Sequence, residues 1–101
     1  MSSDAYRAHL TLRLIEAGVP VTLHAGLREY IAARRPVGGF LTAVLSNDLA
    51  EACKRADEDN RTRICDVLVF LHAYAPAPCW GSPDKVHAWL LDQTPVPEVY
   101  E

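Results

Sequence analysis

The chain has 101 residues, of which 50% are hydrophobic and 23% are charged. This length fits one domain, and this composition is typical of globular proteins and not of disordered or fibrous chains. The formal net charge of −3 argues against a protein that binds nucleic acid by neutralising many phosphates. It also argues against binding to an anionic membrane by charge alone.

Cysteine usage and hydropathy indicate a cytoplasmic protein. The three cysteines form no CxxC pair and predict no disulfide framework. No apolar run reaches the roughly eighteen residues that a membrane helix needs. The first residues also lack the basic and apolar regions of a signal peptide. We therefore expect a cytoplasmic protein that does not bind membranes.

The first helix is predicted over residues 4–17, where Tyr6, Leu10 and Leu14 recur at a helical spacing. A glycine and a proline just beyond this segment favour a helix end. Alternation of Leu10, Leu12 and Leu14 is also compatible with one strand of a hairpin. Because an isolated hairpin is marginally stable, the helix is the preferred interpretation.

Two further helices are predicted in the middle of the chain. The second spans about residues 23–34, with Thr22 as its N-cap and Pro36 beyond its end. Two glycines then permit a sharp turn into a third helix over about residues 40–56, which carries an apolar stripe along one side.

The last two helices follow stronger signals. The fourth begins at the acidic residues 57–59, and its apolar run 67–71 predicts the most buried helix of the protein. The fifth starts with Ser82 as N-cap and Pro83 in its first turn. The predicted fold is all-α, a compact bundle of four or five short helices. It forms a single domain over residues 1–101, with its core over 20–93 and an extended tail over 94–101.

The third predicted helix contains a polar pair, Asn47 and Asp48. On a helix over residues 40–56, Asp48 falls inside the apolar arc, where an ionised carboxylate needs a partner. The preferred hypothesis is a structural acceptor for backbone N–H groups of residues 79–81 or for Arg55. The alternative hypothesis is a ligand-binding polar pocket, formed by Asn47, Asp48, Asn60 and Trp80.

The acidic run at residues 57–60 resembles the start of a calcium-binding loop. An EF-hand loop would continue with a glycine and a distal glutamate, whereas here residues 61–63 are Arg-Thr-Arg. Helix capping explains the cluster without a metal. If the protein binds a partner through acidic residues, the candidates are Glu51, Asp57, Glu58 and Asp59.

Cysteine and histidine side chains predict neither a metal site nor a nucleophile. Cys53, Cys65 and Cys79 lack the close pair spacing of structural zinc ligands. Cys79 could pair with His72 or His87, but no motif supplies an oriented base and an oxyanion site. We therefore expect no metal, no cofactor and no enzymatic activity.

The fourth and fifth predicted helices carry more apolar surface than one core-facing side requires. Val69 and Ala73 lie opposite the core stripe of the fourth helix, and Leu91 lies off the inward arc of the fifth. Coverage by another helix is the preferred explanation, and a homodimer patch formed by these three residues is the alternative.

Four runs of the sequence are distinctive in order and spacing: GLREYI at 26–31, GGFLTAVLSNDL at 38–49, ADEDN at 56–60, and CWGSP at 79–83 ahead of Trp89. Together they resemble a family of short uncharacterised proteins from phages, prophages and their hosts. The resemblance covers about residues 20–90. It implies a phage or mobile-element origin and brings no catalytic residues with it.

The leading functional hypothesis is a non-enzymatic phage or prophage accessory protein that binds a host protein or defence complex, for example as an anti-CRISPR-type inhibitor. Acidic surface suits a target with a basic groove. The alternative is a small-ligand or nucleotide-binding helical domain. The third hypothesis, direct nucleic-acid binding, has no phosphate loop, aromatic RNA-binding motif or typical recognition helix to support it.

Overall fold

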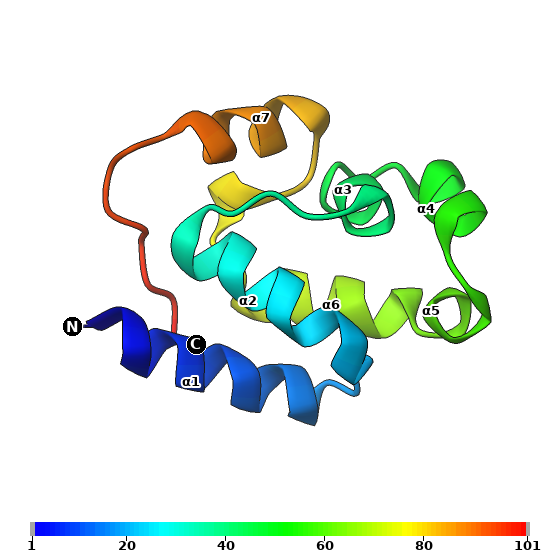
Figure 1. Cartoon of the computed structure of the whole chain (residues 1–101), viewed down its shortest axis with the longest axis horizontal. Helices are drawn as coiled ribbons and strands as arrows, with labels where there is room; N and C mark the ends of the chain where they lie inside the picture. The colour runs from blue at the N-terminus through cyan, green and yellow to red at the C-terminus, as the bar shows by residue number, and fades with distance from the viewer. Residues whose placement is uncertain (1, 101) are drawn as a thin grey trace.

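The computed structural model describes the backbone of residues 2–100 and the side chains of residues 4–100. Within this part of the chain every regular element is a helix, and there is no strand. The elements are α1 (Ser2–Glu16), η1 (Val21–Leu23), α2 (His24–Ala33), α3 (Gly39–Leu45), α4 (Leu49–Arg55), α5 (Glu58–Thr62), α6 (Ile64–Tyr74), η2 (Ala77–Cys79) and α7 (Pro83–Leu91) (Figure 1). The all-α prediction is confirmed, but four or five helices was too few, since residues 2–100 hold seven α-helices.

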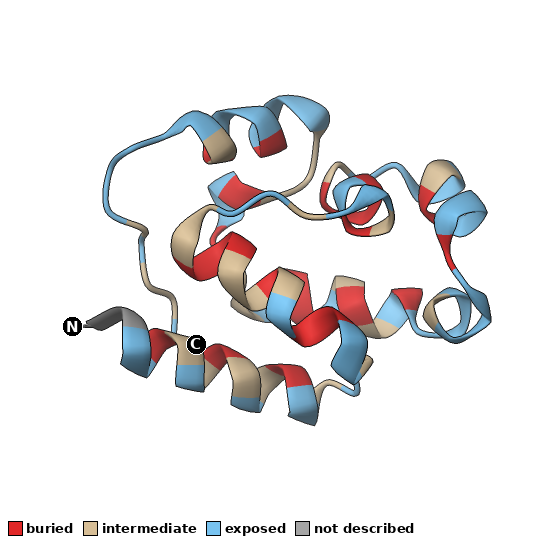
Figure 2. Cartoon of the chain, in the orientation of Figure 1, coloured by how far each residue is buried: buried red, intermediate tan, exposed pale blue. Residues whose placement is uncertain are grey.

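The core lies where α1, α2, α3, α6 and α7 meet. Figure 2 shows the buried residues of α1, α2 and α6 on the sides that these helices turn toward one another. None of the helices in residues 2–100 combines the length and the apolar character needed to cross a bilayer. The side chains that are essentially inaccessible to solvent include Tyr6, Leu10, Leu14, Leu27, Tyr30, Ile31, Val44, Leu45, Val67, Phe70 and Leu71.

Helix α1 is helical throughout, so the alternative of a strand is wrong. Tyr6, Leu10 and Leu14 are buried at the predicted spacing, and Arg7 connects the helix to α2 through a 3.0 Å ion pair with Glu29. Tyr6, Leu10 and Leu14 belong to the core, so the core begins well before the expected boundary at residue 20.

Helix α2 begins differently from the prediction. Thr22 lies in the middle of the 3-10 turn η1, and no side chain caps α2 at its N-cap residue, Leu23. The predicted N-cap role of Thr22 is therefore wrong, because the 3-10 turn runs directly into the helix. At the other end Arg34 adopts a left-handed conformation with φ 57°, and its N–H donates to the carbonyl of Tyr30 at 3.0 Å.

The third and fourth predicted helices are each broken in two. Residues 46–48 separate α3 from α4, and Asn47 has φ 61°, a left-handed conformation that asparagine tolerates better than most residues. Arg63 separates α5 from α6. Helix α6 buries Val67, Phe70 and Leu71, but Val69 is 63% exposed and one side of the helix faces solvent. The prediction that this is the most buried helix is therefore wrong, since α2 buries a larger share of its residues.

Helix α7 and the tail complete the fold. The Ser82 hydroxyl accepts a hydrogen bond from the Lys85 N–H at 3.1 Å, which confirms the predicted N-cap. The tail returns from α7 to α1 (Figure 1), where the Tyr100 ring lies 4.8 Å from the His9 ring, centroid to centroid. Residues 94–100 form no helix or strand, and Glu101 lies outside the described residues.

Candidate functional site

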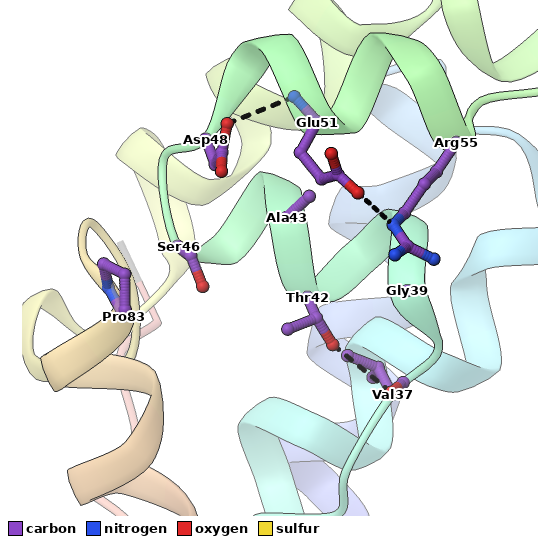
Figure 3. Close-up of a pocket in the computed structure, with 9 residues that line it drawn as sticks. All are labelled: Val37, Gly39, Thr42, Ala43, Ser46, Asp48, Glu51, Arg55 and Pro83. Atoms are coloured by element: carbon purple, nitrogen blue, oxygen red, sulfur yellow. Dashed lines mark hydrogen bonds and ion pairs between the residues drawn. The ribbon is translucent and has the colours of Figure 1, made fainter.

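A cleft of about 460 Å³ opens between α3, α4 and the first residue of α7 (Figure 3). Figure 3 places Ser46 and Pro83 on one side of this cleft and Glu51 and Arg55 on the other. Its lining combines two carboxylates, one guanidinium and two hydroxyls with small apolar groups. The residues are Val37, Gly39, Thr42, Ala43, Ser46, Asp48, Glu51, Arg55 and Pro83.

Asp48 lies at the rim of the cleft as the N-cap of α4. Its carboxylate accepts a hydrogen bond from the Glu51 N–H at 3.1 Å, and the residue is exposed. The prediction of a buried Asp48 is therefore wrong, because the helix that would have turned it inward ends at Leu45. Asp48 is an acceptor for backbone N–H, as the structural hypothesis states, but for its own helix and not for residues 79–81.

Glu51 and Arg55 form the charged wall of the cleft. The Arg55 Nε donates to the Glu51 carboxylate at 2.6 Å, and the Lys54 Nζ lies 3.6 Å from the same carboxylate. These two cations hold the pKa of Glu51 below its usual range, with the Arg55 hydrogen bond as the largest cause. The Arg55 guanidinium lies so close to the backbone of Gly39 that a Cβ there would come within 2.8 Å of it.

The acids of α5 follow directly after α4. Asp57 caps α5 by accepting a hydrogen bond from the Asn60 N–H at 2.7 Å, while Glu58 and Asp59 occupy the first turn and are exposed. The capping interpretation is thus confirmed. Among residues 2–100, none of these three acids has an ion-pair partner, in contrast to Glu51.

The structure does not bring the four predicted pocket residues together. Asp48 lines the cleft of Figure 3, whereas Trp80 lines a separate pocket between α6, η2 and α7. Asn47 is exposed in the turn before α4. Asn60 lies in α5, with its Oδ1 buried and without a hydrogen bond to any described residue. These positions separate because the breaks at 46–48 and at Arg63 redirect the chain.

The apolar residues proposed for a dimer patch are open to solvent. Val69 is 63% exposed and Leu91 is 65% exposed, and Ala73 is exposed one turn after Val69. Coverage by another helix, the preferred expectation, is therefore wrong for all three. Their role in a homodimer stays a prediction.

Nothing in the described residues points to an enzyme. Cys79 is fully buried, and this burial raises the pKa of its thiol to about 12, so a reactive thiolate does not form at neutral pH. Cys53 and Cys65 are exposed. In the part of the chain that the structure describes, no three side chains of the histidine, cysteine or carboxylate type gather as metal ligands.

Sequence reasoning missed Thr42, Ser46 and Pro83 as cleft residues. One local signal was available: Asp48 and Glu51 stand three residues apart, the spacing of a capping box, and thereby predict a helix start at residue 49. A helix start at residue 49 would have predicted the bend between α3 and α4. The approach of Pro83 to this bend depends on how α7 packs and has no local signal.

Comparisons of the chain with protein-family models, with curated proteins and with solved structures found no significant match in any of the three.

Proposed function

We propose that this chain is a non-enzymatic accessory protein of phage or prophage origin that acts by binding a protein of the host cell. Its contact surface is the acidic side of α4 and α5 together with the adjoining cleft. The origin follows from the resemblance in residues 20–90. The target is a host protein with a basic surface, such as a nucleic-acid-binding defence complex.

One observation carries this proposal: consecutive elements present carboxylates that have no ion pair among residues 2–100. Asp48, Asp57, Glu58 and Asp59 are all exposed, and the two caps among them are held in place by hydrogen bonds from backbone N–H groups. Fixed carboxylates of this kind favour encounter with a positive partner surface and orient it. Glu51 contributes less, because Arg55 and Lys54 already neutralise it.

The cleft adjoins this charged surface and offers it a concave contact region. Its Ser46 and Thr42 side chains and its exposed Arg55 offer polar contacts next to the small apolar side chains of Ala43 and Pro83. Arg55 and Lys54 already pair with Glu51, so the cleft carboxylate without an ion pair among the described residues is that of Asp48. We therefore expect a long basic side chain of the target to approach Asp48 at the rim of the cleft.

The test is affinity capture of host proteins by the tagged chain from a bacterial lysate, identified by mass spectrometry. The double variant Glu58→Lys/Asp59→Lys reverses two carboxylates in the first turn of α5. We expect it to lose the captured protein, with binding to the wild-type chain weakened by added salt because the contacts are ionic.

The matched control is Asp4→Lys/Asp84→Lys. Its two carboxylates also lie in first turns, of α1 and α7, and the change in net charge is the same. This control should retain the captured protein. Equal capture by both double variants would contradict the proposed surface, and the absence of any captured host protein would contradict the proposed function.

A further inference from the structure

A second pocket, of about 320 Å³, lies where the end of α6, the turn η2 and the start of α7 meet. It is separate from the cleft of Figure 3, with which it shares no residue. Its volume is at the lower end of the range for small-ligand pockets. Its lining residues are His72, Ala75, Ala77, Trp80, Gly81 and Lys85.

The polar side chains of this pocket are hydrogen-bond donors with free capacity. Among residues 2–100, the Lys85 ammonium forms no ion pair, and neither the Trp80 indole N–H nor the His72 ring forms a hydrogen bond. No carboxylate lines the pocket. A site with an ammonium, an imidazole and an indole N–H, and with no acid, is complementary to an anion.

Hydrogen bonds to the backbone fix the turn that carries Trp80 and Gly81. Gly81 has φ 120°, a conformation that L-residues rarely adopt, and its N–H donates to the carbonyl of Leu45 at 2.7 Å. The Lys85 side chain bends back toward this glycine, with its Nζ 3.6 Å from where a Cβ at Gly81 would lie. The carbonyl of the fully buried Cys79 accepts a hydrogen bond from the Tyr30 hydroxyl at 2.8 Å, which anchors the preceding turn.

Trp80 supplies the apolar part of the pocket. Its ring packs against the core on one side and remains partly exposed. A neighbouring hollow of about 520 Å³ shares Ala77 and Lys85 with the pocket and is lined mainly by apolar side chains and Asp84. An anionic group would therefore lie on the His72 side of Lys85, away from Asp84, and a flat ring would pack on Trp80.

From this arrangement we propose that the pocket binds a nucleoside monophosphate or a ligand of the same chemistry, a planar heterocycle that carries a phosphate. The phosphate accepts hydrogen bonds from Lys85 and His72, and the heterocycle packs on Trp80. The site is independent of the protein-binding surface proposed above.

The two tryptophans allow a direct test by ¹H–¹⁵N NMR. The Trp89 indole N–H is buried and donates to the Tyr30 carbonyl at 2.8 Å, whereas the Trp80 indole is free to respond to a ligand. Titration with each of the four common nucleoside monophosphates should shift the Trp80 indole signal in a saturable way and leave the Trp89 signal in place. The Trp80→Phe variant assigns the two signals.

Variants of the two lysines in the chain separate the pocket from general attraction of anions. Lys85→Gln should weaken binding about tenfold or more, because it removes a charge-assisted hydrogen bond. Lys54→Gln removes the same charge from α4, outside the pocket, and should leave the affinity unchanged. Adenosine, which lacks the phosphate, should bind more weakly than adenosine monophosphate.

Three results would overturn the proposal: no shift of the Trp80 signal with any of the four nucleotides at millimolar concentration, equal weakening by both lysine variants, or equal affinity for adenosine and its monophosphate. The Glu58→Lys/Asp59→Lys variant should bind nucleotide like the wild-type chain. Failure of this proposal is therefore distinguishable from failure of the protein-binding proposal.

Discussion

The guanidinium of Arg34 lies over the ring of Trp89, with its Cζ atom 3.9 Å from the ring centre. Its Nη1 donates to the Trp89 carbonyl at 3.0 Å, and the Trp89 indole N–H donates back to the Tyr30 carbonyl at 2.8 Å. Asp92 lies 3.8 Å from Nη2. These contacts attach α7 to the end of α2 and thereby position the helix that contributes to both the cleft and the Trp80 pocket.

Replacement of Arg34 by alanine should lower the free energy of unfolding by about 2–3 kcal/mol, since the variant loses a desolvated cation–π contact and a hydrogen bond from a charged group. Urea denaturation measures this change. The neighbouring Arg35 is exposed and its side chain makes no hydrogen bond within the described residues. Arg35→Ala should therefore stay within about 0.5 kcal/mol of the wild type. Equal stability of the two variants would show that the Arg34–Trp89 contact contributes nothing.

Tyr30→Phe should destabilise the fold by about 1–3 kcal/mol, because it leaves the buried carbonyl of Cys79 without its hydrogen-bond donor. The same bond anchors the turn before Trp80, so the Trp80 indole signal should also shift in the NMR spectrum of this variant. Tyr74→Phe is the control, since the Tyr74 hydroxyl has no hydrogen-bond partner among residues 4–100. A Tyr30→Phe protein as stable as this control would contradict the anchoring role.

Asp48→Ala should lower the stability by about 1 kcal/mol, the usual effect of removing an N-cap. Asp48→Asn should melt at nearly the wild-type temperature, because asparagine also caps helices and the exposed carboxylate has no ion pair in the described part of the chain. Thermal denaturation compares the two variants. A large loss of stability in Asp48→Asn would show that the negative charge itself supports the fold.

The tail should control the titration of His9. Burial is the largest cause that lowers the pKa of the His9 ring, and the charge of Arg13 adds to it, while Glu16 opposes it. The ring has Tyr100 of the tail at 4.8 Å and Tyr74 of α6 at 6.1 Å, centroid to centroid. Removal of the Tyr100 ring should therefore raise the pKa of His9 toward its ordinary value, as followed by NMR titration of the imidazole.

The sign of the corresponding pH effect on stability follows from linkage. His9 has a lower pKa in the folded state than in the unfolded state, so the unfolded state binds more protons between the two values. The contribution of His9 is fully present above the unfolded pKa, near 6.5, and is lost as the pH falls through the folded pKa. Tyr100→Ala should reduce this acid sensitivity, whereas Tyr100→Phe, which keeps the ring, should preserve it. An unchanged His9 pKa in Tyr100→Ala would contradict the contact.

Short-range signals in the chain were sufficient to predict several elements. Tyr6, Leu10 and Leu14 predicted α1 because a periodic apolar face must be buried, whatever it packs against. Ser82 with Pro83 predicted the start of α7 because a side-chain cap and a proline act within one turn. Asp57 as a cap followed from the same reasoning. The all-α class follows from the same local patterns.

The placement of Trp80 and Lys85 was decided by packing between distant segments, whereas that of Asp48 depends on the local break at residues 46–48. Periodicity alone gave no reason to stop a helix at Leu45, and only the left-handed Asn47 converts one stripe into two helices that meet at an angle. Trp80 joins Lys85 and His72, not Asp48, because Gly81 bonds to Leu45 and Tyr30 holds Cys79. Gly81 and Leu45 are separated by 36 positions in the sequence, and Tyr30 and Cys79 by 49. The residues next to each of them in the chain carry no information about contacts at such separations. The amino-acid pattern thus determined which segments are helical and how several of them begin, whereas long-range hydrogen bonds and buried contacts determined which side chains share a pocket.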